Sequence, residues 1–245
     1  MGNGGSIQTT GGSLPPATPP PPGVTRLRHC AQQCNKCISK EDGELLATKF
    51  LMAGSAFVEF IRHLGGFAGQ SADEVRKHLS TIMRAGSQRT LREVLTDERA
   101  RNALAYEQQD SAARGAIWVV RTMRFWEKVC SERLEIAAGR VADPPSFHQT
   151  VMSAYESVLK SHLDGGGRAA FELAAMAAPA WDEIRAKLVL EDGTDADFAA
   201  DAAEFLPLVG EVADQLEALL HECYPQYVTH HAALQSEAAG GRPAA

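Results

Sequence analysis

The stretch SAARGAIWVVRTMRFWEKVCSE, residues 111–132, decides the fold class of this chain. Its apolar residues recur every three or four positions, and it contains no proline and one glycine. This rhythm predicts one long helix whose apolar stripe faces a core. The edge beside the stripe carries an indole and three guanidiniums at helical spacing, from Arg114, Trp118, Arg121 and Arg124. These groups are either solvated at the edge of an ordinary bundle helix, or they bind a ligand with an anionic or sugar head and an apolar tail.

The same helical rhythm continues on both sides of this stretch, and no segment alternates as strands do. Gly65 and Gly66 are typical of a helix end, and Ser71 with Glu74 has the spacing of a capping box. Pro207 should kink the last helix. The sequence therefore predicts an all-α protein. Its expected helices cover residues 44–64, 72–84, 90–104, 146–163, 168–178, 181–190 and 195–223 in addition to the central one.

The charge of the chain restricts its partners. The whole chain carries a net charge of −7, although residues 1–40 hold four basic side chains and no acidic one. The remainder is therefore acidic, which argues against nucleic acid as a partner, because nucleic acid requires a basic surface. No apolar run approaches the roughly 20 residues that cross a bilayer, and the N-terminus lacks a signal-peptide pattern. Five cysteines, an odd number, then indicate reduced thiols and a cytoplasmic protein.

The first 41 residues are expected to form a disordered leader. Their Gly, Ser, Thr and Pro content cannot bury enough apolar surface to fold. The opening MGNGGS places Gly2 and Ser6 in the pattern for N-myristoylation. One myristoyl chain binds a membrane only marginally, so a second signal is needed. The basic residues of the leader could supply it by attraction to anionic lipid. They are Arg26, Arg28, Lys36 and Lys40.

A cluster of potential metal ligands lies in the same leader, at HCAQQCNKC. Its members are His29, Cys30, Cys34 and Cys37. The spacing matches no common zinc finger, and no later cysteine pair completes a tetrahedral set. We therefore expect no metal and no cofactor, and interpret the thiols as free or palmitoylated. No nucleophile, base and orienting group fall in a recognisable motif either, so we expect no enzyme.

Four segments, taken in order, carry a resemblance to a known family. They are FLMAGSAFVEFIRHLG at 50–65, TLREVL at 90–95, WVVRTMRFW at 118–126 and AYESVLKSHLDGGGRAAFELAAMAAP at 154–179. Together they resemble the glycolipid transfer protein family, which includes the ceramide-1-phosphate transfer proteins. The resemblance implies that residues 42–228 form a two-layer helical sandwich, followed by a flexible tail at 229–245. Such a sandwich holds one lipid with its acyl chains between the layers and its headgroup at the surface.

The family's headgroup site can be carried over residue by residue. The resemblance matches Asp73 to an aspartate that accepts a hydrogen bond from the lipid amide. Four residues on, Lys77 stands where the glycolipid branch has asparagine and the phosphate branch has lysine. A second register puts Glu74 and His78 at these positions, because apolar residues follow them directly, as they follow the family's pair. We favour Asp73 and Lys77 on residue type.

The central helix and the segment after Tyr155 complete the implied site. Trp118 matches a tryptophan that stacks on the sugar in the glycolipid branch, and Arg121 matches the family's arginine. A guanidinium can hold a phosphate through two parallel hydrogen bonds, so sugar and phosphate headgroups both stay open. The family has a histidine donor to the lipid amide where this chain has Leu163; His162 is one residue early, about 100° around a helix. If His162 does not reach the lipid, the lost hydrogen bond costs about 1–3 kcal/mol.

The leading hypothesis is thus a lipid carrier or lipid sensor. It would take one sphingolipid or related two-tailed lipid from the cytosolic leaflet, as a peripheral membrane protein of the cytoplasm. The alternative is a membrane-tethered helical adapter of the same fold that has lost lipid transfer. The acyl chains would lie against apolar residues of the helices. These are Phe57, Phe60, Ile61, Leu64, Val75, Leu79, Ile82, Met123, Leu159, Phe171, Leu173 and Met176.

Overall fold

The computed structural model describes residues 14–16, 18–189 and 193–226, and this part of the chain forms nine α-helices and no strand. The prediction of an all-α protein is confirmed. Two short 3-10 turns, Ala105–Glu107 and Lys160–His162, connect helices. The helices are α1 Arg26–Cys37, α2 Ala47–His63, α3 Gly66–Gly86, α4 Leu91–Arg101, α5 Ala112–Ala137, α6 Phe147–Val158, α7 Gly165–Met176, α8 Trp181–Leu188 and α9 Asp195–Cys223.

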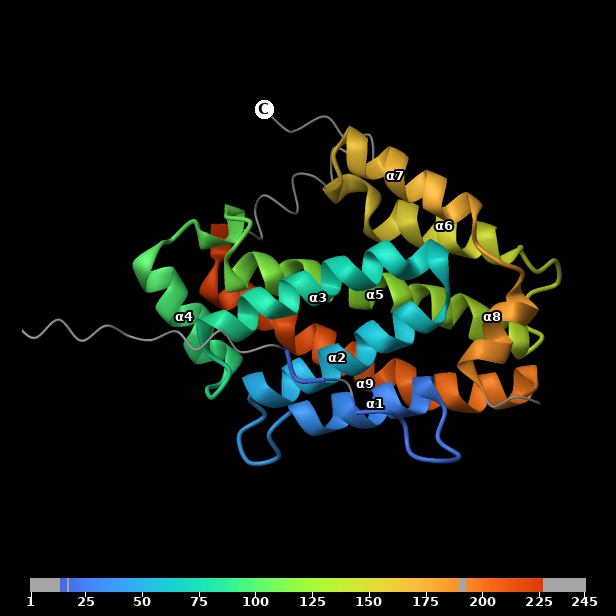
Figure 1. Cartoon of the computed structure of the whole chain (residues 1–245), viewed down its shortest axis with the longest axis horizontal. Helices are drawn as coiled ribbons and strands as arrows, with labels where there is room; N and C mark the ends of the chain where they lie inside the picture. Colours follow the sequence, from blue (N-terminus) through green and yellow to red (C-terminus); the bar gives the residue numbers. More distant parts are fainter. Residues whose placement is uncertain (1–13, 17, 190–192, 227–245) are drawn as a thin grey trace, which may run out of the picture.

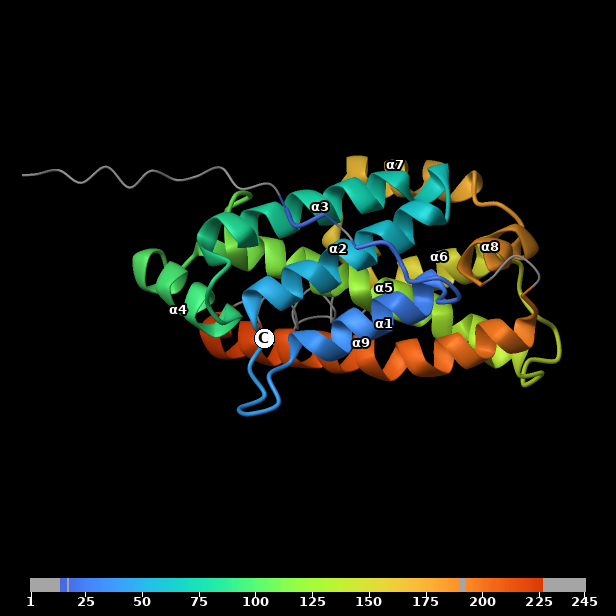
Figure 2. The ribbon, with the colours of Figure 1, turned by 60° about the horizontal axis from the view of Figure 1, so that its bottom comes forward.

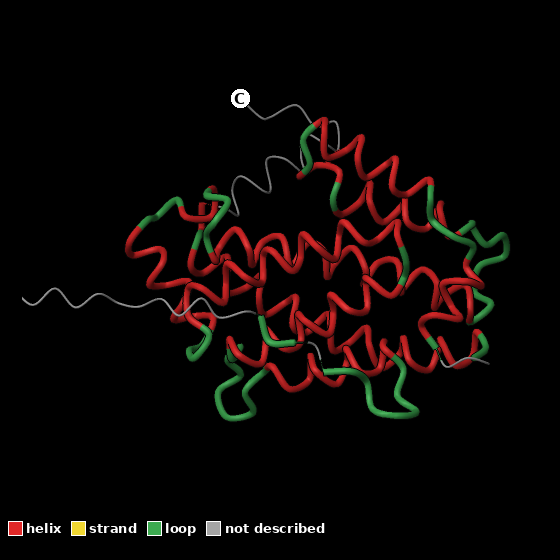
Figure 3. Tube along the Cα trace, viewed as in Figure 1, coloured by secondary structure: helices red, strands yellow, loops and turns green. Residues whose placement is uncertain are grey.

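Helix α5 lies at the centre of the molecule. It packs against α3 on one side and α9 on the other, while α1 joins α2 to α9 (Figure 1). The pair α6–α7 covers the edge of α5 and α3, and the rotated view places α1 beside α9 on the side away from α7 (Figure 2). The trace in Figure 3 shows helices running along the long axis with short loops at their ends. In the described part of the chain, no helix has the length and apolarity that a bilayer span requires.

Side-chain caps set where the central helices begin. The Ser111 hydroxyl accepts a hydrogen bond from the Arg114 amide at the start of α5. The Glu98 carboxylate accepts from the next two orphan amides, those of Ala112 and Ala113, at 2.8 Å each. Such caps contribute about 1 kcal/mol each, and the carboxylate also complements the positive end of the helix dipole. The α4–α5 connection is thereby fixed to the first turn of α5.

At two helix boundaries the glycines act differently from the sequence prediction. Helix α3 begins at Gly66 and not at residue 72, because Gly65, with φ of 115°, makes the whole turn from α2. Ser71 is therefore inside a helix and does not cap one. The three glycines at 165–167 do not interrupt the chain but form the first turn of α7. There the Asp164 carboxylate caps the Gly167 amide at 2.7 Å.

The prediction of a disordered leader through residue 41 was wrong for residues 26–37, which form α1. The Thr25 hydroxyl caps this helix and also bonds to Asp201 of α9. The buried Asp201 carboxylate pairs with the Arg28 guanidinium at 2.6 Å. Leu27 and the three cysteines of this segment form an apolar stripe that is buried in the core. Composition over the whole leader concealed that stripe, because prolines dominate the residues before it.

The burial of α1 changes the interpretation of its thiols. All five cysteines of the chain are free and buried. A buried thiol packs as a small apolar side chain and is inaccessible to acylation, so the palmitoylation reading was wrong for Cys30, Cys34 and Cys37. The described residues contain no cluster of three side chains that could hold a metal ion. Gly2 and the tail at 229–245 lie outside the described residues.

Candidate functional site

A cavity of about 350 Å³ lies between α3, α5, α6 and α7, and it has two chemically different ends. Polar side chains from α3, the α4–α5 connection and α5 form its mouth. The inner part is lined by aromatic and aliphatic side chains. The mouth contains Glu74, Lys77, His78, Gln109, Arg114 and Trp118. The inner wall includes Phe67, Phe125, Trp126, Val151, Leu159, Leu163 and Phe171.

Trp118 is the centre of the mouth, and three side chains contact its ring. The His78 imidazole stacks on it with a centroid distance of 6.2 Å and an interplanar angle of 9°. The guanidinium carbons of Arg114 and Arg121 lie 5.6 Å and 5.0 Å from the indole centroid. The quadrupole of an indole attracts cations placed over its face. The indole therefore orients two guanidiniums of α5 and one imidazole of α3.

The stacking of His78 on Trp118 depends on a close approach of α3 to α5. A Cβ atom at Gly115 would lie 2.7 Å from the His78 carbonyl oxygen and closer still to the Thr81 hydroxyl. Only glycine lets the two backbones come this near. Gly115 stands one turn before Trp118, so the crossing point of the helices is beside the mouth.

The register of α3 can now be described. Glu74, Lys77 and His78 line the mouth, whereas Asp73 does not. The Asp73 side chain is 73% exposed and pairs with the Arg62 guanidinium at 2.6 Å. The buried apolar residues of α3 turn its 74–78 edge toward the cavity, which is the packing argument for the second register. Asp73, which residue type favoured, lies outside the cavity lining, while Lys77 lies within it.

The electrostatics of the mouth favour an anion. Burial, followed by the positive charges of Lys77 and Arg114, lowers the pKa of His78 to about 4. His78 is therefore neutral at pH 7 and leaves the positive charge to its neighbours. Glu74 is the one carboxylate in the lining, 4.0 Å from the Lys77 ammonium. Arg114 makes no ion pair within the part of the chain that the structure describes.

Arg121 and His162, both predicted for the headgroup site, line a second cavity of about 400 Å³ between α5, the 160–162 turn and α9. The guanidinium of Arg121 still lies over the Trp118 ring, but His162 is absent from the lining of the first cavity. Leu163 lines that first cavity in its place. The 3-10 turn, which ends α6 early, directs neighbouring residues 162 and 163 to different cavities.

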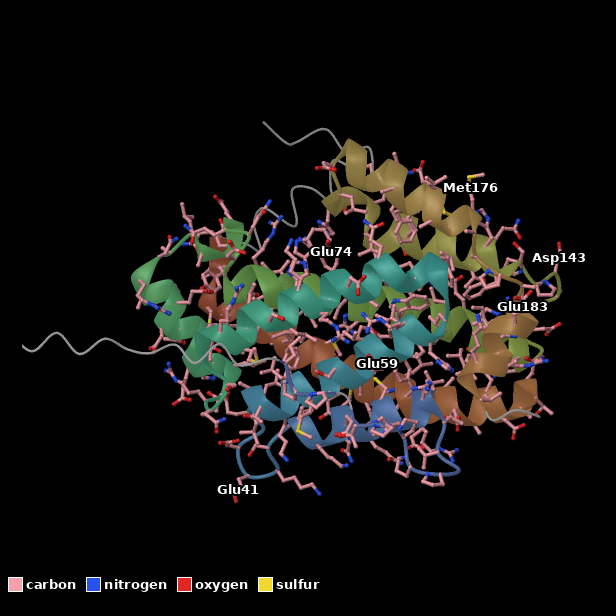
Figure 4. All side chains as sticks on the ribbon, viewed as in Figure 1. Glu41, Glu59, Glu74, Asp143, Met176 and Glu183 are labelled. Atoms are coloured by element: carbon pink, nitrogen blue, oxygen red, sulfur yellow. The ribbon has the colours of Figure 1, made fainter. Side chains whose placement is uncertain are left out.

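The predicted acyl-chain residues divide into three groups. Leu159 and Phe171 line the first cavity. Leu173 and Met176 were wrongly placed in the chain pocket, because they are 71% and 76% exposed on the outer face of α7. Figure 4 shows Met176 pointing away from the body, while Glu74 lies on α3 below α7. The others are buried in the closed core and do not line this cavity, namely Phe57, Phe60, Ile61, Leu64, Val75, Leu79, Ile82 and Met123.

Sequence reasoning missed most of the inner wall, including Phe67, Phe125, Trp126 and Val151. Phe125 and Trp126 belong to the WVVRTMRFW motif, and Phe125 lies one turn beyond Arg121. Phe67 was missed because α3 was expected to begin six residues later, at residue 72. The ring contacts join these side chains: Trp126 lies edge-on to Phe67 and Phe125 at 6.3 Å and 5.1 Å.

Comparison with known proteins agrees with this architecture. Residues 45–189 match the family model described as glycolipid transfer protein. A mutant of the Arabidopsis protein ACD11 (accelerated-cell-death 11), solved with C12 ceramide-1-phosphate, superposes with a TM-score of 0.69 at 18% identity, covering 81% of this chain and 96% of that one. Human ceramide-1-phosphate transfer protein, solved with 12:0 ceramide-1-phosphate, gives a TM-score of 0.67 at 16% identity over 81% and 97% of the two chains.

HET-C2, a fungal glycolipid transfer protein, gives a TM-score of 0.62 at 17% identity, covering 77% of this chain and 92% of that one. Among curated protein sequences, none matches the chain. The solved structures establish the fold, and the family model extends over more than half of the sequence. The chain belongs to the glycolipid transfer protein family.

Proposed function

We propose that this chain carries one phosphate-bearing sphingolipid between membranes of the cytoplasm. The headgroup would lie at the mouth formed by Lys77, Arg114 and Trp118, and a hydrocarbon chain would enter the aromatic inner cavity. The observation that carries this proposal is the continuity of a cationic mouth with an apolar interior in a single cavity. The complexes of ACD11 and of the human transfer protein with ceramide-1-phosphate support it.

A carrier of this kind needs no covalent step. Moving an acyl chain through water costs about 0.8 kcal/mol for each CH₂ group, and an apolar cavity removes most of that cost. The inner wall, from Phe67 to Phe171, offers such a surface. The aromatic rings of this wall contact one another, and we expect them to separate when a chain enters.

The surroundings of Trp118 favour phosphate over sugar. A sugar ring would stack on an open indole face, but here His78 and two guanidiniums already contact the indole. A guanidinium binds phosphate oxygens through two parallel hydrogen bonds, which a neutral sugar cannot match in charge. In this proposal Trp118 orients Arg114 and does not itself bind the headgroup.

Glu74 is our candidate for the group that accepts a hydrogen bond from the lipid amide. Its carboxylate lies at the mouth, 3.9 Å from the His78 Nε2 atom and 4.0 Å from the Lys77 ammonium. Asp73 is engaged with Arg62 outside the cavity lining. The proposal therefore adopts the register that packing favours, and Glu74→Gln should weaken lipid binding more than Asp73→Asn.

Peripheral membrane contact is also part of the proposal. Leu173 and Met176 form an exposed apolar pair on α7, the helix that covers the cavity. Exposed apolar side chains rimmed by polar ones are typical of interaction surfaces. Insertion of these two side chains into the headgroup layer would bring the cavity close to a leaflet. N-myristoylation of Gly2 would add a second, reversible contact.

The test is vesicle-to-vesicle transfer of two labelled lipids that share one ceramide, ceramide 1-phosphate and glucosylceramide. We expect transfer of the phosphate lipid and little transfer of the sugar lipid. Arg114→Gln should remove phosphate transfer, whereas the matched control Arg140→Gln, at an exposed arginine in the loop that follows α5, should not. Faster transfer of the sugar lipid would overturn the phosphate assignment. Transfer of neither lipid would favour the tethered adapter.

A further inference from the structure

Two buried donors on α5 have no hydrogen-bond acceptor in the described part of the chain. They are Nε1 of Trp126 and Nε of Arg133, in side chains of residues that are 2% and 6% exposed. The residues are seven positions apart, so they lie on the same face of α5. A buried donor without a partner is destabilising, and native proteins leave few of them. The pair therefore needs an explanation beyond packing.

The two side chains border the same small internal void, which has a volume of about 10 Å³. That volume is at the lower limit for a single water molecule. Trp126 lines both this void and the lipid cavity, so it forms the wall between them. A lipid chain that reached the void from the cavity would therefore have to displace this ring.

Arg133 is also a buried cation that pairs with no carboxylate among the described residues. Its Nη1 atom donates to the Pro145 carbonyl at 3.2 Å, and its guanidinium carbon lies 4.3 Å from the Trp181 ring centroid. Burial lowers its pKa, while Asp195 and Asp182 act in the opposite direction from beyond ion-pair distance. A cation in this setting is stabilised by an added acceptor oxygen, especially a charged one.

The void lies at the depth that a lipid chain would reach. Trp126 and Arg133 follow Trp118 by eight and fifteen residues, which correspond to about 12 Å and about 22 Å along the helix axis. An acyl chain spans about 15 Å, half of the roughly 30 Å hydrocarbon thickness of a bilayer. With a headgroup at Trp118, the end of a chain would lie between the two donors.

We propose that the space between Trp126 and Arg133 binds the far end of a lipid chain that carries an acceptor oxygen, as a terminal hydroxyl or carboxylate. The Trp126 Nε1–H and the Arg133 Nε–H donate to this oxygen. The inference rests on the proposed function, because it takes the headgroup to lie at Trp118. It assigns the cavity a preference for lipids with an oxygenated chain end.

The experiment measures competitive uptake of three ceramide 1-phosphates from vesicles by native mass spectrometry. Their acyl chains are identical except for a terminal methyl, hydroxyl or carboxyl group. The wild type should take up the better oxygenated lipid about tenfold more than the methyl lipid. Preference for the hydroxyl or for the carboxyl form identifies the oxygen. Equal uptake of all three overturns the inference and leaves the proposed function intact, whereas uptake of none overturns both.

Trp126→Phe is the decisive variant, because it keeps a ring and removes only the N–H donor. We expect the uptake ratio to fall toward one and the melting temperature to stay constant or rise, since an unpartnered donor has been removed. Tyr155→Phe is the matched control: it removes another buried, unpartnered polar atom, away from the void, and should keep the ratio. Arg133→Met should act as Trp126→Phe does. An unchanged ratio in Trp126→Phe overturns the assignment.

Discussion

Helix α5 carries one arginine on the side of α3, Arg114, and another on the side of α9, Arg124, and the two guanidiniums have different surroundings. On the side of α3, Arg114 lies at the cavity mouth over Trp118 and makes no ion pair among the described residues. On the side of α9, Arg124 is held by three carboxylates, those of Glu127 at 2.9 Å, Glu217 at 2.8 Å and Asp214. One side can accept an anion from outside, and the other is already neutralised.

The comparison shows that partners from another helix decide what an arginine does. Both guanidiniums project from the same helix, but α9 supplies carboxylates to Arg124, whereas α3 brings an imidazole, an ammonium and the one carboxylate of Glu74 to the mouth beside Arg114. The hydrogen bonds that Arg124 donates to the Glu217 carboxylate raise the pKa of Arg124 above its ordinary value. Arg124 therefore fastens α5 to α9, and we expect its loss to affect folding more than lipid binding.

Arg124→Ala should give the largest change in stability. It would leave three partly exposed carboxylates close together without their cation, and we expect a loss of about 1–2 kcal/mol in the free energy of unfolding. Urea denaturation measures this loss. Lipid transfer for each folded molecule should stay at the wild-type rate. A variant that remains as stable as the wild type but fails to transfer lipid would reverse the roles given to the two sides.

Arg114→Gln should have the opposite profile. Hydrogen bonds to a charged group contribute about 1.5–3 kcal/mol, so ceramide 1-phosphate should bind tenfold to a hundredfold more weakly. Stability should change by less than about 0.5 kcal/mol, because the side chain is partly exposed and unpaired. Equilibrium binding to a fluorescent ceramide 1-phosphate tests the first expectation. Unchanged binding would remove Arg114 from the headgroup site.

His78 offers a way to sharpen the comparison by pH. Its pKa is about 4 in the folded protein and 6.5 in the unfolded chain. The unfolded state therefore binds a proton first as the pH falls, and the contribution of His78 to stability, complete above pH 6.5, is lost toward pH 4. Between pH 7 and pH 5 this loss amounts to about 2 kcal/mol. His78→Gln should reduce the acid sensitivity by that amount in urea titrations; equal slopes would show that His78 is not the group responsible.

The central helix and the all-α class could be predicted from the sequence, because the spacing of apolar residues determines them. Trp118 could be singled out as a candidate site residue from its residue type and its position on that helix. The two roles of Arg114 and Arg124 could not, since they depend on which helix packs on each side of α5. The sequence also did not predict that His162 and Leu163 line different cavities, because this follows from a 3-10 turn after the end of α6. The periodicity of the sequence had predicted that the helix continues to residue 163.

Register on α3 shows the same limit. Residue type favoured Asp73, but burial of the apolar residues of α3 turns Glu74 and His78 toward the cavity. Packing and residue type predicted different registers for α3. Packing determines the geometry, because several buried side chains together fix the rotation of the helix. Helix α1 was missed for a related reason: its apolar stripe is short and follows a proline-rich segment, so the composition of the whole leader did not indicate it.

Gly115 gives the last and smallest test. Gly115→Ala would push a methyl group against the Thr81 hydroxyl and the His78 carbonyl. The hydroxyl can turn away, but the carbonyl belongs to the backbone of α3, so the helices must separate. Overpacking of this kind costs about 1 kcal/mol or more.

The separation should also act on the mouth, because it moves His78 from Trp118 and releases the indole that orients Arg114. Phosphate-lipid binding should therefore fall more than the small loss of stability explains, while the Arg124 side stays intact. Gly69→Ala, on the same helix as His78 and with open space at its Cβ position, is the matched control. It should keep lipid binding and, as a replacement of helical glycine, stabilise the fold by about 0.5–1 kcal/mol. If both variants bind lipid equally well, the close crossing of α3 and α5 is a matter of packing alone, and the orientation of Arg114 by Trp118 does not depend on it.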